Sequence, residues 1–249
     1  MINFLFLTLA FIKTDKELMV TTQVAMLEHG KINMPSDTDG IVIEIGCSDR
    51  NTADDEILPK YPKGFLISFE PLLDKYAVLL ARGTERYHKH LKDKAVPLGH
   101  HHNRGVVIPM AVSPTGGQLS FHVSKVAGCS SLLEINRNTR WGRSCLNQLE
   151  NRTVDSMKIE DLISLLPDKM PIHYMKFDMQ GLDGTIITKL PQDFLARVQT
   201  IHFESVNPVC NALYEGQMQC PYIAEFLNKN GFEGKCRPGC EPTSTFFKT

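Results

Sequence analysis

Short apolar runs that end at polar residues recur along the chain and predict the strands of a parallel sheet. The clearest is GIVIEIGCSD at 40–49, where four β-branched residues surround the carboxylate of Glu44 and the run stops at Gly46. A run of this kind is typical of a central strand that is covered on both faces. Gly46 lets the backbone turn tightly, and Ser48 and Asp49 can cap a following helix. We therefore place a polar, acid-containing turn at the carboxyl end of this strand.

Further segments have the pattern of strands. Four apolar runs predict strands of the same sheet, at 64–69, 105–112, 172–177 and 198–203. The segment 118–123 alternates apolar and polar residues and predicts a strand that pairs as a hairpin. Residues 232–248 predict two short strands around a Pro/Gly turn, which form an antiparallel edge on the mostly parallel sheet.

Helical patterns lie between these strands. They occupy 14–28, 51–58, 72–80, 154–166 (which begins extended and becomes helical), 183–190 and 221–230. Strands that alternate with helices predict an α/β fold. We expect a doubly wound, mostly parallel Rossmann-like sheet, with helices on both faces and an antiparallel edge near the C-terminus.

The chain divides into an N-terminal segment, 1–37, and a single domain, 38–249. Residues 1–12 are apolar but too short to span a bilayer as a helix. They resemble the core of a signal peptide with Ala10 near a candidate cleavage site, although no Lys or Arg precedes them. Packing on the domain and a truncated anchor are the alternatives. Any membrane contact is expected through these residues only.

The composition is that of a folded globular protein, with 42% hydrophobic and 22% charged residues. Lys plus Arg number 27 and Asp plus Glu number 28, so the formal net charge is −1. A general nucleic-acid binder carries a basic excess, and we therefore expect no nucleic-acid partner.

Four predicted strands end in carboxylates that belong on one rim of the sheet, at Glu44–Asp49, Glu70, Asp178 and Glu204. The carboxyl ends of parallel strands form the ligand-binding rim of open α/β sheets. A buried carboxylate there needs a hydrogen-bond donor or a ligand. Glu70 follows the glycine turn by about twenty residues, where an acid can accept hydrogen bonds from the ribose hydroxyls of a nucleoside. Pro71 is then placed to lie against the base.

Four stretches in this order resemble the FkbM-type S-adenosylmethionine-dependent methyltransferases: IEIGCSD, FEPL, IPMAVSP and MKFDMQGLDGTII. The resemblance covers residues 38–248, and its most specific part is the Asp-x-Gln-Gly-x-Asp sequence at 178–183. It implies a class I methyltransferase-like fold and S-adenosylmethionine as cofactor. In that family the first strand and turn hold the methionine part, and the acid after the second strand binds the ribose. The cofactor-binding residues implied here are Glu44, Gly46, Cys47, Ser48, Glu70, Pro71, Ala111 and Asp178.

The chain departs from the family pattern after the first turn. The family usually has a second glycine where Arg50-Asn51-Thr52 stand here, which puts the conformation of this loop in question. The difference counts more heavily against a nicotinamide enzyme. A dinucleotide site needs G-x-G-x-x-G to approach a pyrophosphate, and only Gly46 is present.

The resemblance implies a methyl transfer, for which we favour O-methylation of a small-molecule or glycan hydroxyl. Because the sulfonium methyl is already activated, the protein has to align an acceptor and remove a proton. Asp178 is the first candidate base, followed by Glu204 and His202. The alternative for Asp178 is a structural or cofactor-binding role, and the alternative for His202, inside a strand, is a core position. A non-catalytic nucleoside-binding or interaction domain on the same fold is the second hypothesis for the chain.

Residues 124–153 lack clear periodicity and contain four arginines and the only tryptophan, Trp141. A polar excursion of this kind between sheet elements is a candidate substrate loop. The alternative is a tolerated surface insertion.

The last four of the seven cysteines, at 210, 220, 236 and 240, lie among Pro/Gly turns. In an oxidising compartment they could form two disulfides, with three pairings to choose from. Zinc is the alternative, but the spacing provides only one close pair. Disulfides, the glycosylation sequon Asn151-Arg152-Thr153 and the apolar start favour a secretory or membrane-associated location over the cytoplasm.

A histidine cluster lies at 88, 90 and 100–102. Adjacent residues in a loop rarely all point inward with the geometry that a metal requires. We expect a solvated loop here and no metal site.

Overall fold

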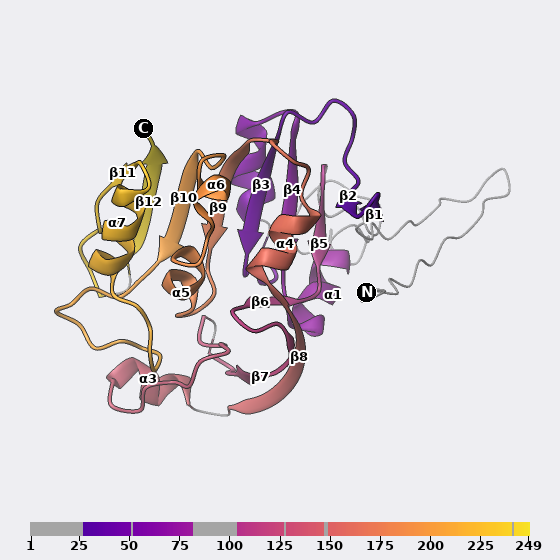
Figure 1. Ribbon diagram of the computed structural model, residues 1–249. Helices are drawn as coiled ribbons and strands as arrows, with labels where there is room; N and C mark the ends of the chain where they lie inside the picture. Colours follow the sequence, from indigo (N-terminus) through magenta and orange to yellow (C-terminus); the bar gives the residue numbers. More distant parts are fainter. Residues whose placement is uncertain (1–26, 51, 82–103, 127, 147–148, 241) are drawn as a thin grey trace, which may run out of the picture.

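The computed structural model describes residues 27–50, 52–81, 104–126, 128–146, 149–240 and 242–249. Its centre is a seven-stranded sheet with the order β11-β12-β10-β9-β3-β4-β5 (Figure 1). The strands are β3 (Gly40–Ile45), β4 (Gly64–Phe69), β5 (Gly105–Ile108), β9 (Ile172–Phe177), β10 (Thr200–Glu204), β11 (Phe232–Gly234) and β12 (Thr243–Lys248). Each of these strands lies in or overlaps a segment predicted to be extended.

The sheet is parallel except at one edge. The pairs β3–β4, β4–β5, β3–β9 and β9–β10 are parallel, whereas β12 runs antiparallel to both β10 and β11. The chain starts at the centre with β3, moves outward to β5 and returns to β9 on the other side of β3. The strand order therefore reverses between β3 and β9, and open α/β sheets bind ligands at such a switch point.

Successive side chains of the central strand β3 point to opposite faces of the sheet, and each face is covered by helices or helical turns. Ile41 and Ile43 belong to the main core with residues of α4 (Ile159–Leu165), α5 (Asp183–Ile187), α6 (Gln192–Leu195) and α7 (Cys220–Lys229). Val42 points the other way and packs with Ala53 and Leu58, which lie in a π-helical turn (Ala53–Ile57) and a 3-10 turn (Leu58–Lys60). On that second face α1 (Leu73–Ala81) buries Leu79 against Val107 of β5. The doubly wound fold predicted from the sequence is confirmed.

The apolar run 105–112 does not form one strand as predicted. It is divided between β5 in the main sheet and β6 (Ala111–Ser113) in a separate three-stranded sheet. Pro109 has no N–H for a ladder, and the Met110 N–H donates to the Ile108 carbonyl at 2.8 Å, so the chain turns sharply. This turn carries the chain out of the main sheet.

The predicted local hairpin at 118–123 is also wrong in its pairing. That segment forms β7 (Gly117–Val123), which pairs antiparallel with the much later β8 (Glu150–Lys158). The strand β6 pairs parallel with β8 on its other side, giving the order β6-β8-β7. The partner of an alternating strand is set by tertiary contacts, and here β8 separates the two strands that are neighbours in sequence.

The helix predicted over 14–28 is wrong at its last two residues, and the rest of it lies outside the described residues. Leu27–Glu28 form β1, which pairs antiparallel with β2 (Lys31–Ile32) across a turn at His29 and Gly30. Both turn residues have positive φ, 50° and 77°. Ile32 is buried in the main core, and the Lys31 ammonium contacts Asp168 at 2.9 Å. Within the described residues, no helix has the length and apolar character needed to cross a membrane.

Three disulfides are present among the described cysteines. Two of them join the four C-terminal cysteines, as Cys210–Cys240 and Cys220–Cys236, with Cα–Cα distances of 5.4 and 5.9 Å. These pairs confirm the predicted disulfides and show which of the three pairings forms. Because all four sulfur atoms are in disulfides, they are not available as zinc ligands. The third bond, Cys129–Cys145, was not predicted. The histidine cluster at 88–102 lies outside the described residues.

Candidate functional site

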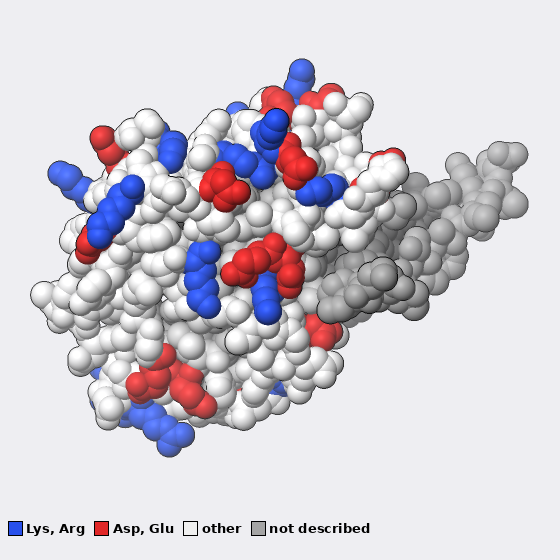
Figure 2. Space-filling view, viewed as in Figure 1, with Lys and Arg blue, Asp and Glu red and all other residues white. Residues whose placement is uncertain are grey.

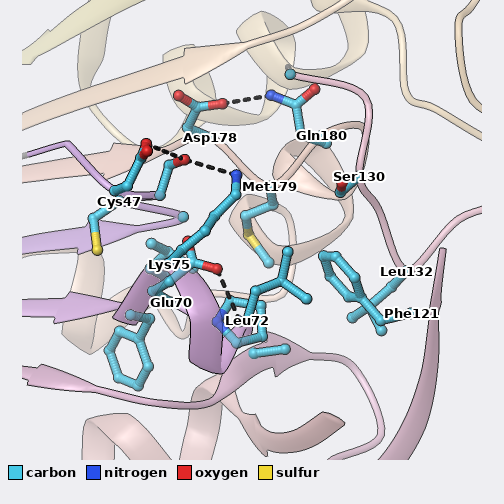
Figure 3. Close-up of a pocket in the computed structure, with 18 of the residues that line it drawn as sticks. Cys47, Glu70, Leu72, Lys75, Phe121, Ser130, Leu132, Asp178, Met179 and Gln180 are labelled. Carbon is cyan, nitrogen blue, oxygen red and sulfur yellow. Dashed lines mark hydrogen bonds between the residues drawn. The ribbon is translucent and has the colours of Figure 1, made fainter. Parts of the chain in front are cut away.

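A cavity of about 380 Å³ lies at the carboxyl rim of β3, β4 and β9, at the switch point of the sheet. Five segments line it: the turn after β3, the end of β4 with the start of α1, the β5–β7 region, the stretch after β7, and the turn after β9. Figure 3 shows how these side chains converge. Of the predicted site residues, those in the lining are Gly46, Cys47, Ser48, Glu70, Pro71, Ala111 and Asp178.

Gly46 allows the ends of three strands to meet. It has φ 86°, and a Cβ at this position would lie 2.0 Å from the Asp178 carbonyl oxygen. The Gly46 and Cys47 N–H groups both donate to the Phe69 carbonyl, and the Asp178 N–H donates to the Ile45 carbonyl. The close approach of the β3 and β9 turns therefore requires a residue without a side chain at Gly46.

The turn after Gly46 carries an ordered polar pair. Ser48 has a left-handed conformation, with φ 57°. Its Oγ accepts a 2.8 Å hydrogen bond from the Lys75 ammonium and lies 3.2 Å from the Asp49 carboxylate. Lys75 reaches the turn from the first helical turn of α1 (Figure 3). The sequence patterns singled out only the apolar face of this helix, so Lys75 was missed.

Cys47 cannot act as a thiolate here. Its side chain is buried beside Leu79 and Val107, and burial raises the pKa of the thiol well above its ordinary value, with Glu44 adding to the effect. The residue lines the cavity with a protonated, packed side chain.

Glu70 is a buried acid at the end of β4, with only 4% of the residue exposed. One carboxylate oxygen accepts a 2.9 Å hydrogen bond from the Leu72 N–H. Burial raises the pKa of Glu70 to about 6, against the opposing effects of the Leu72 N–H and the Lys75 charge. The neighbouring part of the cavity is apolar and includes Met110, Ala111 and Phe121. The ribose-binding role of Glu70 stays a prediction.

Glu44 lies behind the cavity wall rather than in it. The residue is fully buried, and it accepts hydrogen bonds from the Lys176 ammonium at 2.9 Å and from the Ala53 N–H at 3.4 Å. Burial alone would lower the pKa of Lys176, but the carboxylates of Glu44 and Asp178 outweigh it and raise that pKa. Glu44 therefore has no surface in the cavity itself, but it orients Lys176, which lines the cavity.

Asp178 lines the cavity, and each of its two carboxylate oxygens has a contact that orients it. Oδ1 accepts a 2.7 Å hydrogen bond from the Gln180 amide, and Oδ2 lies 3.5 Å from the Lys176 ammonium. The side chain is 37% exposed. The Gln180 amide oxygen in turn accepts from the Tyr214 hydroxyl at 2.9 Å. Asp178 is thus held in one orientation but remains accessible to a ligand.

The second acid of the Asp-x-Gln-Gly-x-Asp sequence, Asp183, has a structural position. It is 1% exposed and accepts hydrogen bonds from the Met179 and Glu204 N–H groups at 3.1 and 3.2 Å. Burial raises the pKa of Asp183 to about 7, and the nearby Asp178 charge contributes. Asp183 therefore ties the turn after β9 to the end of β10.

The other two candidate bases are not among the residues that line the cavity. Glu204 lies 3.5 Å from the Gln180 amide nitrogen, which connects it to Asp178. His202 is half-buried, its Nδ1 lies 2.9 Å from the Thr245 hydroxyl, and burial lowers its pKa. These contacts match the core position given as the alternative for His202. A catalytic role for either residue remains a prediction.

The described part of the candidate substrate loop forms one wall of the cavity. The wall residues are Ser124, Lys125, Val126, Gly128, Ser130 and Leu132. The Ser131 hydroxyl donates to the Gln180 carbonyl at 2.7 Å, and the Tyr214 hydroxyl is 3.2 Å from the Gly128 carbonyl. Farther along, Thr139 caps α3 (Arg140–Cys145), and the end of the predicted loop belongs to β8.

Four residues of the site were missed in the sequence: Lys75, Lys176, Gln180 and Tyr214. Lys176 and Gln180 lie inside the stretch MKFDMQGLD, so their position beside Asp178 was a signal that could have found them. Lys75 follows Glu70 by five residues, but nothing in the sequence indicates that its ammonium reaches Ser48. Tyr214 reaches the site from a segment that is distant in sequence.

Comparisons with known proteins give weak similarities. No family model matches the chain, and no curated protein sequence does either. Among solved structures, a precorrin-6y C5,15-methyltransferase from Geobacter metallireducens GS-15 has 12% identity and a TM-score of 0.35, with 86% of this chain and 84% of that chain covered. A 16S rRNA (adenine(1408)-N(1))-methyltransferase from Catenulisporales acidiphilia has 8% identity and a TM-score of 0.36, with 86% of each chain covered.

The structure of TnmH has 8% identity and a TM-score of 0.35, and the match spans 84% of this chain but half of that chain. With TM-scores below 0.5, these similarities are too weak to support an argument. The fold assignment rests on the strand order, the direction of β12 and the helices on both faces of the sheet.

Proposed function

We propose that this chain is an S-adenosylmethionine-dependent methyltransferase of the FkbM type that methylates a hydroxyl of a small molecule or glycan. The observation that carries the proposal is Glu70, a buried acid at the carboxyl end of β4, beside the Gly46 turn at the switch point. The sheet has the seven strands of a class I methyltransferase-like fold, with one antiparallel strand, β12, inserted between β10 and β11.

The residues present fit the cofactor. Its adenine needs an apolar slot, which Met110, Ala111 and Phe121 supply. Its ribose needs an acceptor of two hydroxyl hydrogen bonds, which Glu70 supplies in its ionised form. Its amino-acid end carries both charges, and the cavity has cations and anions near the β3 and β9 turns, including Lys75 and Asp178.

A nicotinamide dinucleotide fits poorly. Its pyrophosphate would need backbone N–H groups from a glycine-rich turn, and here that turn continues through Cys47, Ser48 and Asp49.

S-adenosylmethionine supplies an activated methyl group, so the protein must orient an acceptor and accept its proton. Asp178 is the first candidate for this role. Gln180 and Lys176 hold its two oxygens, and 37% of its side chain is exposed. Glu204 is the next candidate, because it shares the Gln180 amide with Asp178. His202 is the third.

The acceptor is expected to enter beside the wall formed by residues 124–126 and 128–132. Acidic and basic side chains are interspersed over the face shown in Figure 2, where the described residues form no continuous basic patch. This distribution supports a small-molecule or glycan acceptor over a nucleic acid. The three disulfides are consistent with a secretory or membrane-associated location.

The first test measures the binding of S-adenosylhomocysteine by calorimetry to the parent protein, Glu70→Ala and the control Glu225→Ala. Glu225 is an exposed acid on α7 that pairs with Lys229. We expect binding by the parent and the control, and about 10- to 100-fold weaker binding by Glu70→Ala, because hydrogen bonds to a charged acceptor are lost. Equal affinity in all three proteins would remove the ribose assignment, and no binding by the parent would refute the proposed cofactor.

The second test offers labelled S-adenosylmethionine to the parent with a panel of glycans and small hydroxyl compounds. Transfer to any hydroxyl acceptor supports the methyltransferase, and Asp178→Asn then reports whether its carboxylate is the base. Cofactor binding without transfer to any member of the panel would favour the second hypothesis, a nucleoside-binding domain without catalysis.

A further inference from the structure

Lys75 is one of four cations that line the cavity, with Arg50, Lys125 and Lys176, and among the described residues it forms no ion pair with a carboxylate. Its ammonium donates to a neutral acceptor, the Ser48 hydroxyl, at 2.8 Å. A second of these cations, Lys176, contacts the carboxylates of both Glu44 and Asp178. A half-buried ammonium loses part of its hydration and regains stability only when it is paired.

The position of Lys75 on its helix is also unfavourable for a positive charge. It lies in the first turn of α1, where the helix dipole already contributes positive potential. The Lys75 charge and the α1 terminus therefore act together on the same side of the cavity. This part of the site is suited to a negatively charged group.

The Ser48 hydroxyl is a second polar group next to the Lys75 ammonium. Its left-handed backbone directs Oγ toward Lys75 in the turn that begins at Gly46. The hydroxyl is a donor as well as an acceptor, so it can serve an anion together with the ammonium. Figure 3 shows the Lys75 side chain extending past Glu70 toward this turn.

The proposed binding mode determines which part of the cofactor reaches Lys75. Glu70 fixes the ribose, and the apolar slot lined by Met110 and Phe121 takes the base on one side of it. The amino-acid arm must then extend in the other direction, toward the turns after β3 and β9. The only anionic group of S-adenosylmethionine is the α-carboxylate at the end of that arm.

We propose that Lys75, together with Ser48, binds the α-carboxylate of S-adenosylmethionine. This inference rests on the proposed function and names a residue that the sequence patterns did not identify. It makes Lys75 a binding residue that selects ligands carrying an amino-acid carboxylate. Nucleosides without that group lack the ionic contact and bind less tightly.

The test compares two ligands that differ only in this group: S-adenosylmethionine and decarboxylated S-adenosylmethionine. Each is titrated calorimetrically into the parent, Lys75→Met, Lys75→Arg and the control Lys229→Met. Lys229 is an exposed lysine on α7 whose removal changes the net charge equally. The titrations are made at about pH 8, so that Glu70, with a pKa of about 6, stays ionised in every variant.

We expect the parent and Lys229→Met to prefer the carboxylated ligand by about tenfold or more, the size of a charge-assisted contact. Lys75→Met should bind both ligands with affinities within about twofold of each other, while Lys75→Arg keeps most of the preference. The change in preference isolates the pair formed by Lys75 and the carboxylate, because general effects on the fold affect both ligands alike.

An unchanged preference in Lys75→Met would overturn the carboxylate assignment, even if that variant bound both ligands more weakly. Thermal melting without ligand checks that each variant is folded, and Lys75→Gln replaces Lys75→Met if the latter is not. Failure of the parent to bind either ligand would instead refute the proposed cofactor, so the two failures are distinguishable.

Discussion

At the scale of single residues, Gly46 shows why the cavity forms where it does. Its backbone is left-handed, with φ 86°, and its Cα faces the Asp178 carbonyl so closely that a Cβ would lie 2.0 Å away. Two requirements, conformational and steric, therefore coincide at one position. Both requirements arise because the turn after β3 packs against the turn after β9, which carries Asp178.

Gly46→Ala should cost more stability than the same change at Gly216. Both glycines have positive φ, but a Cβ at Gly216 meets nothing within 4 Å. The left-handed backbone alone costs about 1–2 kcal/mol, and forced overlap adds about 1–3 kcal/mol at Gly46. Urea unfolding measures the difference, and binding of S-adenosylhomocysteine should be lost only at Gly46. Equal stability losses would show that the β3 and β9 turns do not need this close approach.

At the scale of elements, the wall formed by residues 124–126 and 128–132 is held from several directions. The Cys129–Cys145 bond joins it to α3, and the Ser124 hydroxyl donates to the Cys145 carbonyl at 2.7 Å. The Tyr214 hydroxyl contacts both Gly128 of the wall and Gln180, and the Ser131 hydroxyl of the wall donates to the Gln180 carbonyl. The wall and the Asp178 turn therefore form one hydrogen-bonded unit.

Removing Cys129–Cys145 with two alanines should weaken ligand binding, whereas removing Cys220–Cys236 should not. The two bonds have the same sequence separation, 16 residues, so each should cost about 3 kcal/mol of unfolding free energy. Only the first touches the cavity wall, since its neighbours Gly128 and Ser130 line the cavity.

Chemical denaturation and calorimetry with S-adenosylhomocysteine measure the two effects of these disulfide variants separately. We expect a several-fold loss of affinity in the Cys129→Ala/Cys145→Ala protein, because residues of the wall are less ordered before binding. The same loss in the Cys220→Ala/Cys236→Ala protein would show that the affinity responds to global stability and not to the wall.

At the scale of the whole molecule, the rim of the sheet concentrates buried acids. Burial raises the pKa of Glu70 to about 6 and that of Asp183 to about 7. The folded chain therefore binds protons at these two sites more readily than the unfolded chain does. Both carboxylates act against stability when they are ionised, and the fold tolerates them because main-chain N–H groups donate to them.

The free energy of unfolding should therefore include a component that decreases as pH rises from about 4 to about 7. In this window the unfolded carboxyl groups have released protons that folded Asp183 and Glu70 still hold, so raising the pH favours the unfolded state. Denaturation of the parent and Asp183→Asn at a series of pH values measures this component.

The Asp183→Asn protein should be less stable overall, because its amide offers one acceptor oxygen for two N–H groups, but its unfolding free energy should depend less on pH. Comparing it with the parent removes the contributions of other groups, including His202, whose lowered pKa acts in the opposite direction. A pH dependence that is identical in both proteins would contradict a raised pKa at Asp183.

The amino-acid sequence by itself determined the main sheet and the acids on its rim. The bounds predicted for 64–69 and 172–177 agree with β4 and β9, and the central strand agrees within one residue. The reason is local: a strand buried on both faces needs a continuous apolar run, and the polar residue that ends the run marks the rim. Gly46, Glu70 and Asp178 were identified in this way.

Only the tertiary structure decided the contacts that join distant segments. The pairing of β7 with β8, the Cys129–Cys145 bond and the approach of Lys75 to Ser48 each depend on how separate elements are packed. A local pattern states that a residue is apolar, alternating or charged, but it does not specify the partner. The partner is set when burial and hydrogen bonding are satisfied for the whole chain at once, which is why Lys75 could be proposed as a binding residue only from the folded molecule.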